Sequence, residues 1–103
     1  MAKEIILYNL ASHVTDEQYK EYVKNEKGPL LESFSCVNKF TLVKVSHSVK
    51  GQIPYNYVGI LDINNLAEFT QKVVPSEKFQ GFLAKWSTMV QPDFHSLIGE
   101  EIF

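Results

Sequence analysis

Glu26 is the acidic residue whose position most strongly suggests chemistry. Apolar and aromatic residues recur around it at helical spacing, which predicts that position 26 faces inward: Tyr19, Tyr22, Val23 and Leu30. A carboxylate buried there must be paired, hydrogen-bonded or raised in pKa. Buried carboxyls of this kind serve as general acids or bases near neutral pH. We therefore expect Glu26 to be the catalytic base; the alternative is that the helix frays before Gly28 and leaves Glu26 in solvent.

Three tyrosines supply possible hydrogen-bond donors. Tyr8 and Tyr57 lie in predicted strands and Tyr22 in a predicted helix, so their hydroxyls can line one space between sheet and helices. A phenol can donate to an oxyanion that develops on a carbonyl substrate. We expect Tyr8 and Tyr57 to take this role, although tyrosine hydroxyls on strands often simply reach the surface.

The histidines and the cysteine give weaker signals. His95 follows Asp93 and Phe94 and is a candidate catalytic residue at the mouth of a pocket, whereas loop histidines are more often solvated. Cys36 has no neighbouring basic cluster, which favours a buried structural thiol. No spacing of His, Cys or carboxylates fits a metal site, and no glycine-rich nucleotide loop is present, so we expect neither metal nor cofactor.

Aromatic residues near the C-terminal half predict an apolar wall. Phe69, Phe79, Phe82 and Trp86 lie in predicted helices at core-facing positions. Such a wall suits an apolar aromatic small molecule, and it can equally be plain core. The residues expected to bind substrate are Tyr22, Val23, Gly59, Leu61, Phe69 and Trp86, where Gly59 leaves space for a flat ligand or marks a bulge.

Composition limits the classes of partner. The 103 residues suit one domain, residues 1–103. All ten basic residues are Lys and the net charge is −2, which argues against nucleic acid and anionic membranes because Arg is the preferred phosphate and guanine ligand. A single cysteine excludes an internal disulfide, and neither a signal peptide nor a membrane span is visible, so we expect a cytoplasmic protein.

The elements that must position these residues follow from hydrophobic periodicity. Strands are predicted at residues 4–10, 36–46, 57–63 and 97–103, with helices beginning at the caps Thr15, Asn64 or Asn65, and Ser76. Thr15 and Gln18 form a capping box, and Gly28-Pro29 breaks or kinks the first helix. The order β-α-β-β-α-α-β predicts an α+β, ferredoxin-like split β-α-β fold, an antiparallel sheet covered on one face by helices.

The predicted strands are apolar on both faces. Ile5 and Leu7 point one way, and Ile6 and Tyr8 point the other. Helices can cover only one face, so the other face needs a partner, and a symmetric homodimer is the simplest solution. A monomer with an unusually apolar sheet is the alternative.

This pattern resembles the dimeric α+β-barrel superfamily, and within it the RedY-like group encoded in prodiginine and related pigment pathways. The likeness rests on the opening strand, the Thr15-Asp16-Glu17-Gln18 helix start, the third strand, and residues 64–86 with their break at Pro75. It implies a barrel formed by two facing sheets and a ligand pocket between sheet and helices in each subunit.

Departures from that superfamily are informative. Its olivetolic-acid-type cyclases use two histidines where this chain has Glu4 and Glu77 or Lys78. Their mechanism therefore does not transfer unchanged, although Glu4 and Glu77 could form an acid/base pair if both reach the pocket. The haem-degrading members use a helical His near the position of Trp86, and this chain has none, so the resemblance does not imply haem.

The sequence thus predicts a small cofactor-independent protein of secondary metabolism. It would assist condensation, cyclisation or tautomerisation of an aromatic or pyrrole-like intermediate by acid/base catalysis, with Glu26, Tyr8, Tyr57, Glu77 and His95 as candidate catalytic residues. The alternatives are a non-catalytic binding protein or chaperone for pathway intermediates or enzymes and, more weakly, a cofactor-free monooxygenase.

Overall fold

A computed structural model describes all of residues 1–103. The strands are β1 (Ala2–Tyr8), β2 (Val37–Lys44), β3 (Tyr57–Ile63) and β4 (His95–Glu100). The helical segments are α1 (Asp16–Tyr22), η1 (Val23–Lys27), α2 (Gly28–Glu32), α3 (Leu66–Glu68), η2 (Phe69–Val73) and α4 (Glu77–Ser87), where η marks a π-helix. This order confirms the predicted sequence of elements.

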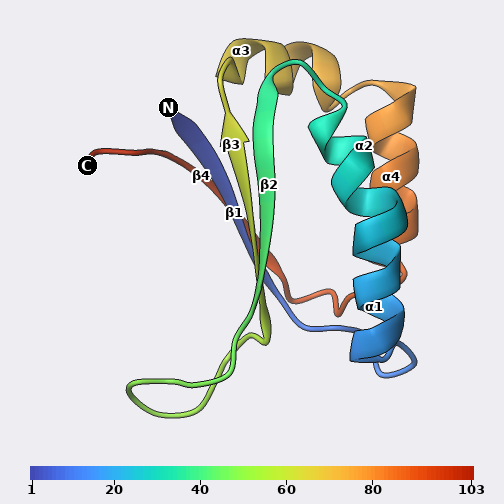
Figure 1. Cartoon of the computed structure of the whole chain (residues 1–103), viewed down its shortest axis with the longest axis vertical. Coiled ribbons are helices and arrows are strands. Elements are labelled where there is room, and N and C mark those ends of the chain that lie inside the picture. Colours follow the sequence, from blue (N-terminus) through green and yellow to red (C-terminus); the bar gives the residue numbers. More distant parts are fainter.

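The four strands form one antiparallel sheet in the order β2-β3-β1-β4. The helices all lie against one face of this sheet, and the other face is left uncovered (Figure 1). The predicted α+β, ferredoxin-like architecture is therefore confirmed. The last strand begins at His95, two residues earlier than predicted, and its register places Ser96 opposite Ile6 of β1.

Helix starts follow the predicted capping chemistry. The Thr15 hydroxyl accepts from the Gln18 amide while the Gln18 side chain accepts from the Thr15 amide, which confirms the capping box. Asn65 and Ser76 cap α3 and α4 through their side-chain oxygens. These caps satisfy first-turn amides that would otherwise lack partners, and so fix where each helix begins.

Both π-helical segments precede a proline by two residues. The amide of Gly28 donates to the carbonyl of Val23, five residues back, and Val74 donates in the same way to Phe69. Pro29 and Pro75 have no amide hydrogen and would clash with a carbonyl four residues back, so an α-helical turn is unfavourable there. A π-turn inserts one residue, which rotates the next turn of the helix by about 100° about its axis.

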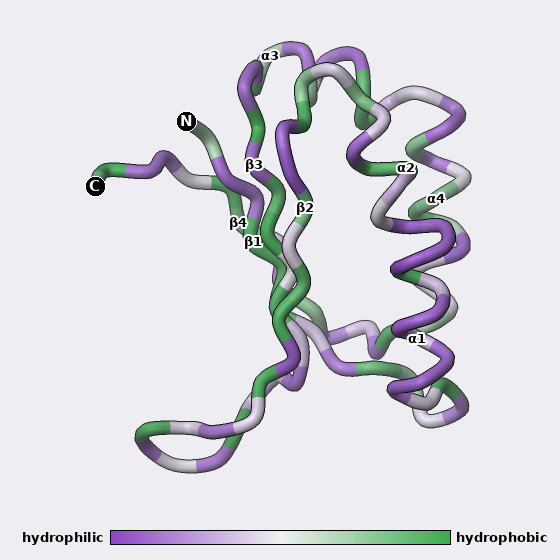
Figure 2. The backbone as a smooth tube through the Cα atoms, in the orientation of Figure 1, coloured by the Kyte–Doolittle hydropathy of each residue, from purple (hydrophilic) through white to green (hydrophobic).

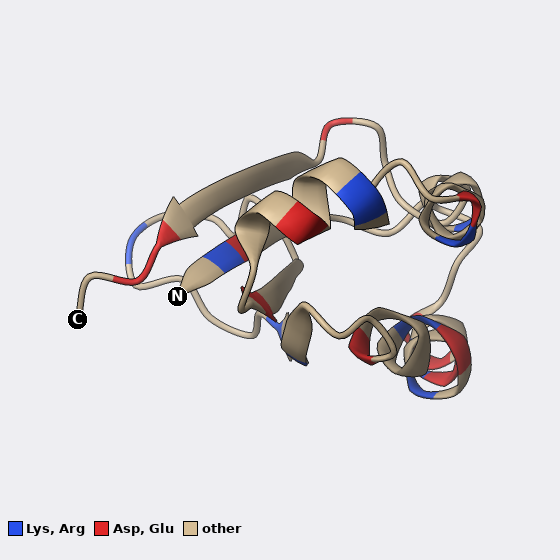
Figure 3. Ribbon diagram, turned by 90° about the horizontal axis from the view of Figure 1, so that it is seen from above, with Lys and Arg blue, Asp and Glu red and all other residues tan.

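Strand alternation places the core between sheet and helices. In β3, Tyr57, Leu61 and Ile63 face the helices and are buried. Figure 2 shows the hydrophobic colouring concentrated along the strands and hydrophilic residues recurring along the helices. Seen from above, two helical segments stand end-on beside each other with charged residues on both (Figure 3).

The uncovered face of the sheet is also apolar. Along each strand, residues that point toward the helices alternate with residues that point away from them. The apolar residues that point away are Ile5, Leu7, Val43, Val58, Ile60 and Leu97. We call this set the outer face. The loop between β2 and β3 and the C-terminal residues both project to this side of the sheet, away from the helices (Figure 1).

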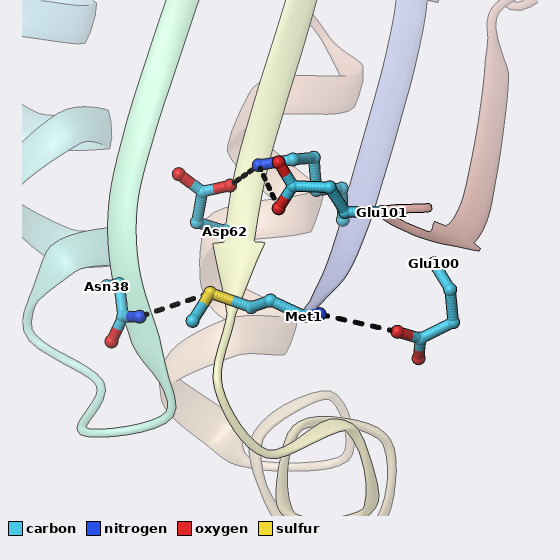
Figure 4. A network of polar contacts seen from close by, with 6 residues as sticks. Met1, Asn38, Asp62, Glu100 and Glu101 are labelled. Carbon is cyan, nitrogen blue, oxygen red and sulfur yellow. Dashed lines mark hydrogen bonds and ion pairs between the residues drawn. The ribbon is translucent and has the colours of Figure 1, made fainter. Parts of the chain in front are cut away.

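A network of polar and charged residues lies at one end of the outer face. Lys3 bonds Asp62 and lies 3.8 Å from Glu101, and the Met1 amino group lies 3.6 Å from Glu100. Figure 4 shows Met1, Asp62, Glu100 and Glu101 gathered there, with Asn38 donating to the Met1 sulfur.

None of the helices has the length and hydrophobicity needed to cross a bilayer.

Candidate functional site

A cavity of about 260 Å³ lies between the sheet and the helices. Ten of its thirteen lining residues are hydrophobic, and the three polar ones are Glu4, Lys27 and Ser96. All four strands contribute to the wall, as do α2 and α4. An apolar cavity with a few converging polar groups is the usual form of a small-molecule site.

Lys27 is the most deeply buried charged residue of the chain, with 1% of its surface exposed. Its Nζ lies 5.0 to 5.7 Å from the ring centroids of four aromatic residues: Tyr8, Tyr19, Phe40 and Trp86. The rings attract the cationic form through their electron-rich faces, yet none of them supplies a full negative charge. Lys27 is therefore an amine enclosed by aromatic side chains at the cavity wall.

Hydrogen bonds hold this amine and order the hydroxyls around it. Tyr19 Oη is 3.0 Å from Lys27 Nζ and 3.0 Å from the indole Nε1 of Trp86, and both nitrogens donate to it. Because these donors occupy both lone pairs of Tyr19, its own hydrogen must go to Tyr8 Oη, 2.5 Å away. Tyr8 Oη is also 3.5 Å from Lys27 Nζ.

Burial moves the pKa of the amine toward neutrality. Loss of solvation lowers the pKa of Lys27 to about 7, against a smaller opposing effect of the Glu4 charge. Removal from water disfavours the charged form of any group. At neutral pH, Lys27 is therefore an appreciably unprotonated amine.

Glu4 is the acidic counterpart in the same cavity. Burial raises the pKa of its carboxyl, while the Ser96 hydroxyl, which donates to Oε2 at 3.1 Å, and the Lys27 charge lower it. The strand register explains the Ser96 bond, because Glu4 of β1 and Ser96 of β4 point to the same side on neighbouring strands. A carboxyl and an amine thus face one largely apolar cavity, and burial shifts both pKa values toward neutral pH.

The prediction that Glu26 faces inward is wrong. Its side chain is 55% exposed and pairs with Lys85 at 2.6 Å on the outside of the helical layer. The prediction assumed a regular α-helix through residue 30, whereas the π-turn at Val23–Lys27 shifts the inward position to Lys27 and then to Leu31. The alternative, that Glu26 lies in solvent, is confirmed, but the reason is the change of helical phase, because the helix continues past Gly28 and does not fray.

The candidate tyrosines are all buried but only one joins the amine. Tyr8 bonds Tyr19 beside Lys27, and burial raises its pKa far above the usual range. Tyr57 stacks on Tyr8, and its hydroxyl donates to Asp16 at 2.5 Å, away from the cavity wall. Tyr22 borders a surface hollow between α1 and α4 together with Glu26. Tyr57 and Tyr22 are therefore aromatic packing around the site.

Glu77 and His95 lie outside the cavity. Glu77 is exposed in the first turn of α4, where a carboxylate favours the helix dipole. His95 is exposed at the start of β4, edge-on to the ring of Tyr55. A Glu4–Glu77 pair does not form, and the residue that joins Glu4 in the cavity is Lys27.

The residues expected to bind substrate divide into wall and core. Leu61 and Trp86 line the cavity. Phe69 is 1% exposed within the core, and Val23 packs against the aromatic cluster. The space above Gly59 is taken by the rings of Phe40 and Tyr8, whose atoms would lie 3.5 and 3.9 Å from a Cβ there. Cys36 is buried, as expected of a structural thiol.

Sequence reasoning missed Lys27 although a signal was present. The signal is Pro29, which we interpreted only as a break near the end of the helix. Pro29 also favours a π-turn in the residues before it, and this turn changes which of them face inward. An inserted residue ahead of a proline moves the inward position by one.

No group of three or more His, Cys, Asp or Glu side chains is close enough together to hold a metal ion.

Known structures share this fold. HapK from Hahella chejuensis is 22% identical, with a TM-score of 0.80 over 99% of this chain and 93% of that one. A dabb family protein with a ferredoxin-like fold from Mesorhizobium loti is 17% identical, with a TM-score of 0.70 over 99% and 97%. A dimeric ferredoxin-like protein from Thermobifida fusca is 14% identical, with a TM-score of 0.72 over 97% and 90%.

The family comparison extends over nearly the whole chain. None of the curated protein sequences is significantly similar to it. The family model described as REDY-like protein HapK, in contrast, matches residues 2–102, from the first residue of β1 to beyond the end of β4. The match includes Glu4, Lys27 and every other residue of the cavity wall, and the chain therefore belongs to the REDY-like HapK family.

Proposed function

We propose that this protein acts in secondary metabolism, of the kind that produces prodiginine-like pigments, without a cofactor. It binds an apolar aromatic or pyrrole-like intermediate in the cavity and promotes condensation, cyclisation or tautomerisation by proton transfer. Membership of the REDY-like family supports the metabolic setting. The unpaired Cys36 fits the cytoplasm, where thiols stay reduced.

The observation that carries the proposal is that Glu4 and Lys27 line the same cavity. They are the only ionisable residues among the thirteen that line an otherwise apolar cavity. Burial raises the pKa of Glu4 and lowers the pKa of Lys27 to about 7. General acids and bases work best when their pKa values lie near the operating pH. The pKa of Glu4 moves toward neutral pH from below, and the pKa of Lys27 moves toward it from above.

The arrangement supports a simple proton relay. The neutral amine of Lys27 removes a proton from a carbon next to a carbonyl or similar electron-withdrawing group. The protonated carboxyl of Glu4 delivers a proton elsewhere on the ligand, which completes a tautomerisation. Transfer of a proton from the ammonium to the carboxylate then restores the starting state. Ser96 orients Glu4, and Tyr19 and Tyr8 orient the amine.

A non-catalytic binding protein is the second candidate. The observation that favours it is that every buried side-chain nitrogen and oxygen already has a hydrogen-bond partner. A lysine held by Tyr19 and Tyr8 can stabilise the cavity shape without donating or accepting protons in a reaction. In this case the cavity would hold a reactive intermediate for a partner enzyme.

We also propose that two copies associate through the outer face. The face is apolar across all four strands, with Leu97 56% and Val43 44% exposed. The loop between β2 and β3 and the C-terminal residues flank it on the same side. The Thermobifida fusca protein with this fold is described as dimeric. A symmetric pair would bury both outer faces against each other.

Native mass spectrometry of the purified protein, before and after incubation with a small-molecule extract of its source cells, tests both the assembly and the ligand. We expect a dimer that gains a discrete mass. Turnover of the captured compound is then compared among the wild type, Glu4→Gln and Lys27→Met. Glu26→Gln is the matched control, because it removes an exposed carboxylate outside the cavity.

The expected result is a loss of turnover of about 10²-fold or more in both cavity variants, with binding retained. Glu26→Gln should behave like the wild type. Binding without any conversion by the wild type would favour the second candidate. Oxygen consumption during turnover would contradict the proton-transfer proposal and favour oxygenation instead.

A further inference from the structure

The Lys27 amine has a chemical capacity beyond proton transfer. Two of its hydrogens are directed to the phenol oxygens of Tyr19 and Tyr8, at 3.0 and 3.5 Å. In the uncharged amine, this leaves the nitrogen lone pair free for another partner. A desolvated lysine in an apolar site is the common design of amine nucleophiles that attack carbonyl groups.

We infer that Lys27 Nζ forms a reversible imine with a small apolar aldehyde or ketone held in the cavity. This inference rests on the proposed ligand-binding function of the cavity and adds the substrate class and a covalent intermediate. The carbonyl compound must be uncharged and apolar, because ten of the thirteen wall residues are hydrophobic. Aromatic ligands are favoured by the rings of Phe79, Phe82 and Trp86 in the wall.

The two exposed residues of the cavity wall, Phe94 and Ser96, lie on its β4 side, which makes this side the route of entry. Phe94, which lines the cavity, is 37% exposed and stands edge-on to Trp86 at 5.0 Å. Phe94 precedes β4 and lies outside any helix or strand. A ligand that enters past Phe94 meets Trp86 first, and Trp86 lies 5.0 Å from the Lys27 amine.

The reaction balances without an oxidant or a reductant. The lone pair of Nζ forms a bond to the carbonyl carbon, and the carbonyl oxygen takes a proton from the Glu4 carboxyl to give a carbinolamine. The nitrogen then loses a proton to the Glu4 carboxylate. Glu4 returns a proton to the departing hydroxyl, which leaves as water as the carbon–nitrogen double bond forms. The resulting iminium gives its remaining N–H proton to the Glu4 carboxylate, which yields the imine and restores the Glu4 carboxyl. Hydrolysis reverses these steps.

The surrounding structure favours Lys27 over the other nine lysines. Eight of those are exposed, and Lys3 is half-buried and bonded to Asp62. An ordinary exposed lysine is almost entirely cationic at neutral pH, and a cationic amine cannot attack a carbonyl. Imine formation at lysine near neutral pH should therefore concentrate at Lys27.

Reductive trapping tests the inference on the full chain. The protein is incubated with 2-naphthaldehyde near pH 7, reduced with cyanoborohydride, and analysed by intact-mass and peptide-mass measurement. We expect one lysine adduct with the mass of the aldehyde less one oxygen atom, located on Lys27. Lys27→Met should lose it, and Lys24→Met, which removes an exposed lysine of the same π-helical segment, should keep it.

Binding of 2-naphthalenemethanol, which cannot form an imine, separates this inference from the proposed function. Binding of the alcohol without a Lys27 adduct from the aldehyde would overturn imine formation and leave the binding cavity intact. Adducts spread over several lysines at equal yield would also overturn it. Absence of binding by both compounds would contradict the cavity proposal itself. Peptide mapping of the wild type locates the adduct independently of the variants.

Discussion

At the scale of single residues, Lys27 needs an explanation that stability does not provide. Placing an ammonium group in an apolar interior costs several kcal/mol unless a counter-charge is close. Here the nearest partners are four aromatic side chains, two of them neutral phenols, while the pKa of Lys27 falls to about 7. A methionine of similar length would fill the same space at no electrostatic cost. A costly group retained in a cavity wall indicates a function.

Lys27→Met should stabilise the protein, and the gain should depend on pH. In the folded chain, the pKa of Lys27 is about 7, against 10.5 for an unperturbed lysine. Between these values, the unfolded chain binds more protons, so the stability of the wild type rises with pH. The advantage of Lys27→Met is therefore largest at and below pH 7 and shrinks by at most about 1.4 kcal/mol per pH unit above it. Chemical denaturation across this pH range measures it.

Other groups around the amine do not reverse this sign. Glu4 and Tyr8 face it from β1 and Tyr19 from α1, and the pKa of Tyr19, at about 12, lies above the range. Lys78 and Lys85 lie on the helical side, at a surface hollow that Lys27 also borders. Lys24→Met serves as the control, with a small difference from the wild type at every pH. A constant gap between Lys27→Met and the wild type would show that Lys27 titrates normally.

The residue scale also shows where prediction from the sequence stops. Buried tyrosines and a buried Trp86 follow from periodicity, and the structure confirms their burial. The choice between Glu26 and Lys27 depends on a single inserted residue in the helix. Hydrophobic spacing leaves that insertion unresolved, because positions 26 and 27 both fall near the stripe set by Tyr19, Tyr22 and Val23.

At the scale of elements, the prolines determine which side chain enters the cavity. The π-turn closed by the Gly28 amide on the Val23 carbonyl sets Lys27 inward. Gly28 suits this turn because a Cβ there would lie 3.0 Å from the Val23 oxygen. The sequence predicted a disturbance at Gly28-Pro29, and the structure shows that the disturbance is an insertion. Helix caps were easier to predict because they depend on local side-chain chemistry alone.

Gly28→Ala should lower the free energy of unfolding by about 1 kcal/mol, because the new methyl group crowds a backbone oxygen that cannot move independently. Gly81→Ala is the matched control within α4. A Cβ at Gly81 meets nothing within 4 Å, so this substitution should raise the free energy of unfolding by about 0.5 to 1 kcal/mol through helix propensity. Urea denaturation of both variants measures the difference, and equal stabilisation by both would contradict the tight π-turn.

At the scale of the whole molecule, both faces of the sheet are apolar, and each has its own contact surface. Its inner face forms the core and the cavity, and its outer face is apolar with nothing over it in a single chain. The sequence predicted this division because both alternating sets of strand positions are apolar. The cavity itself could not be predicted, since its volume depends on how far helices and sheet stand apart once all side chains are packed.

The outer face gives the last prediction. Ile60 lies at its centre, opposite Ile5 of β1 and Thr41 of β2. We expect the wild type to be a dimer and Ile60→Lys to be a folded monomer, as measured by light scattering after size exclusion and by circular dichroism. A lysine buried at an apolar contact is costly, and a two-fold interface contains each residue twice, so one substitution counts double.

Lys24→Glu is the control, because it alters charge on the helical layer and leaves the outer face unchanged. It should remain a dimer. A dimer that survives Ile60→Lys would place the contact elsewhere, and a monomeric wild type at high concentration would contradict self-association. Since the cavity lies on the opposite face of the same strands, monomeric Ile60→Lys should still bind 2-naphthalenemethanol. Loss of binding together with the dimer would mean that the second copy completes the site.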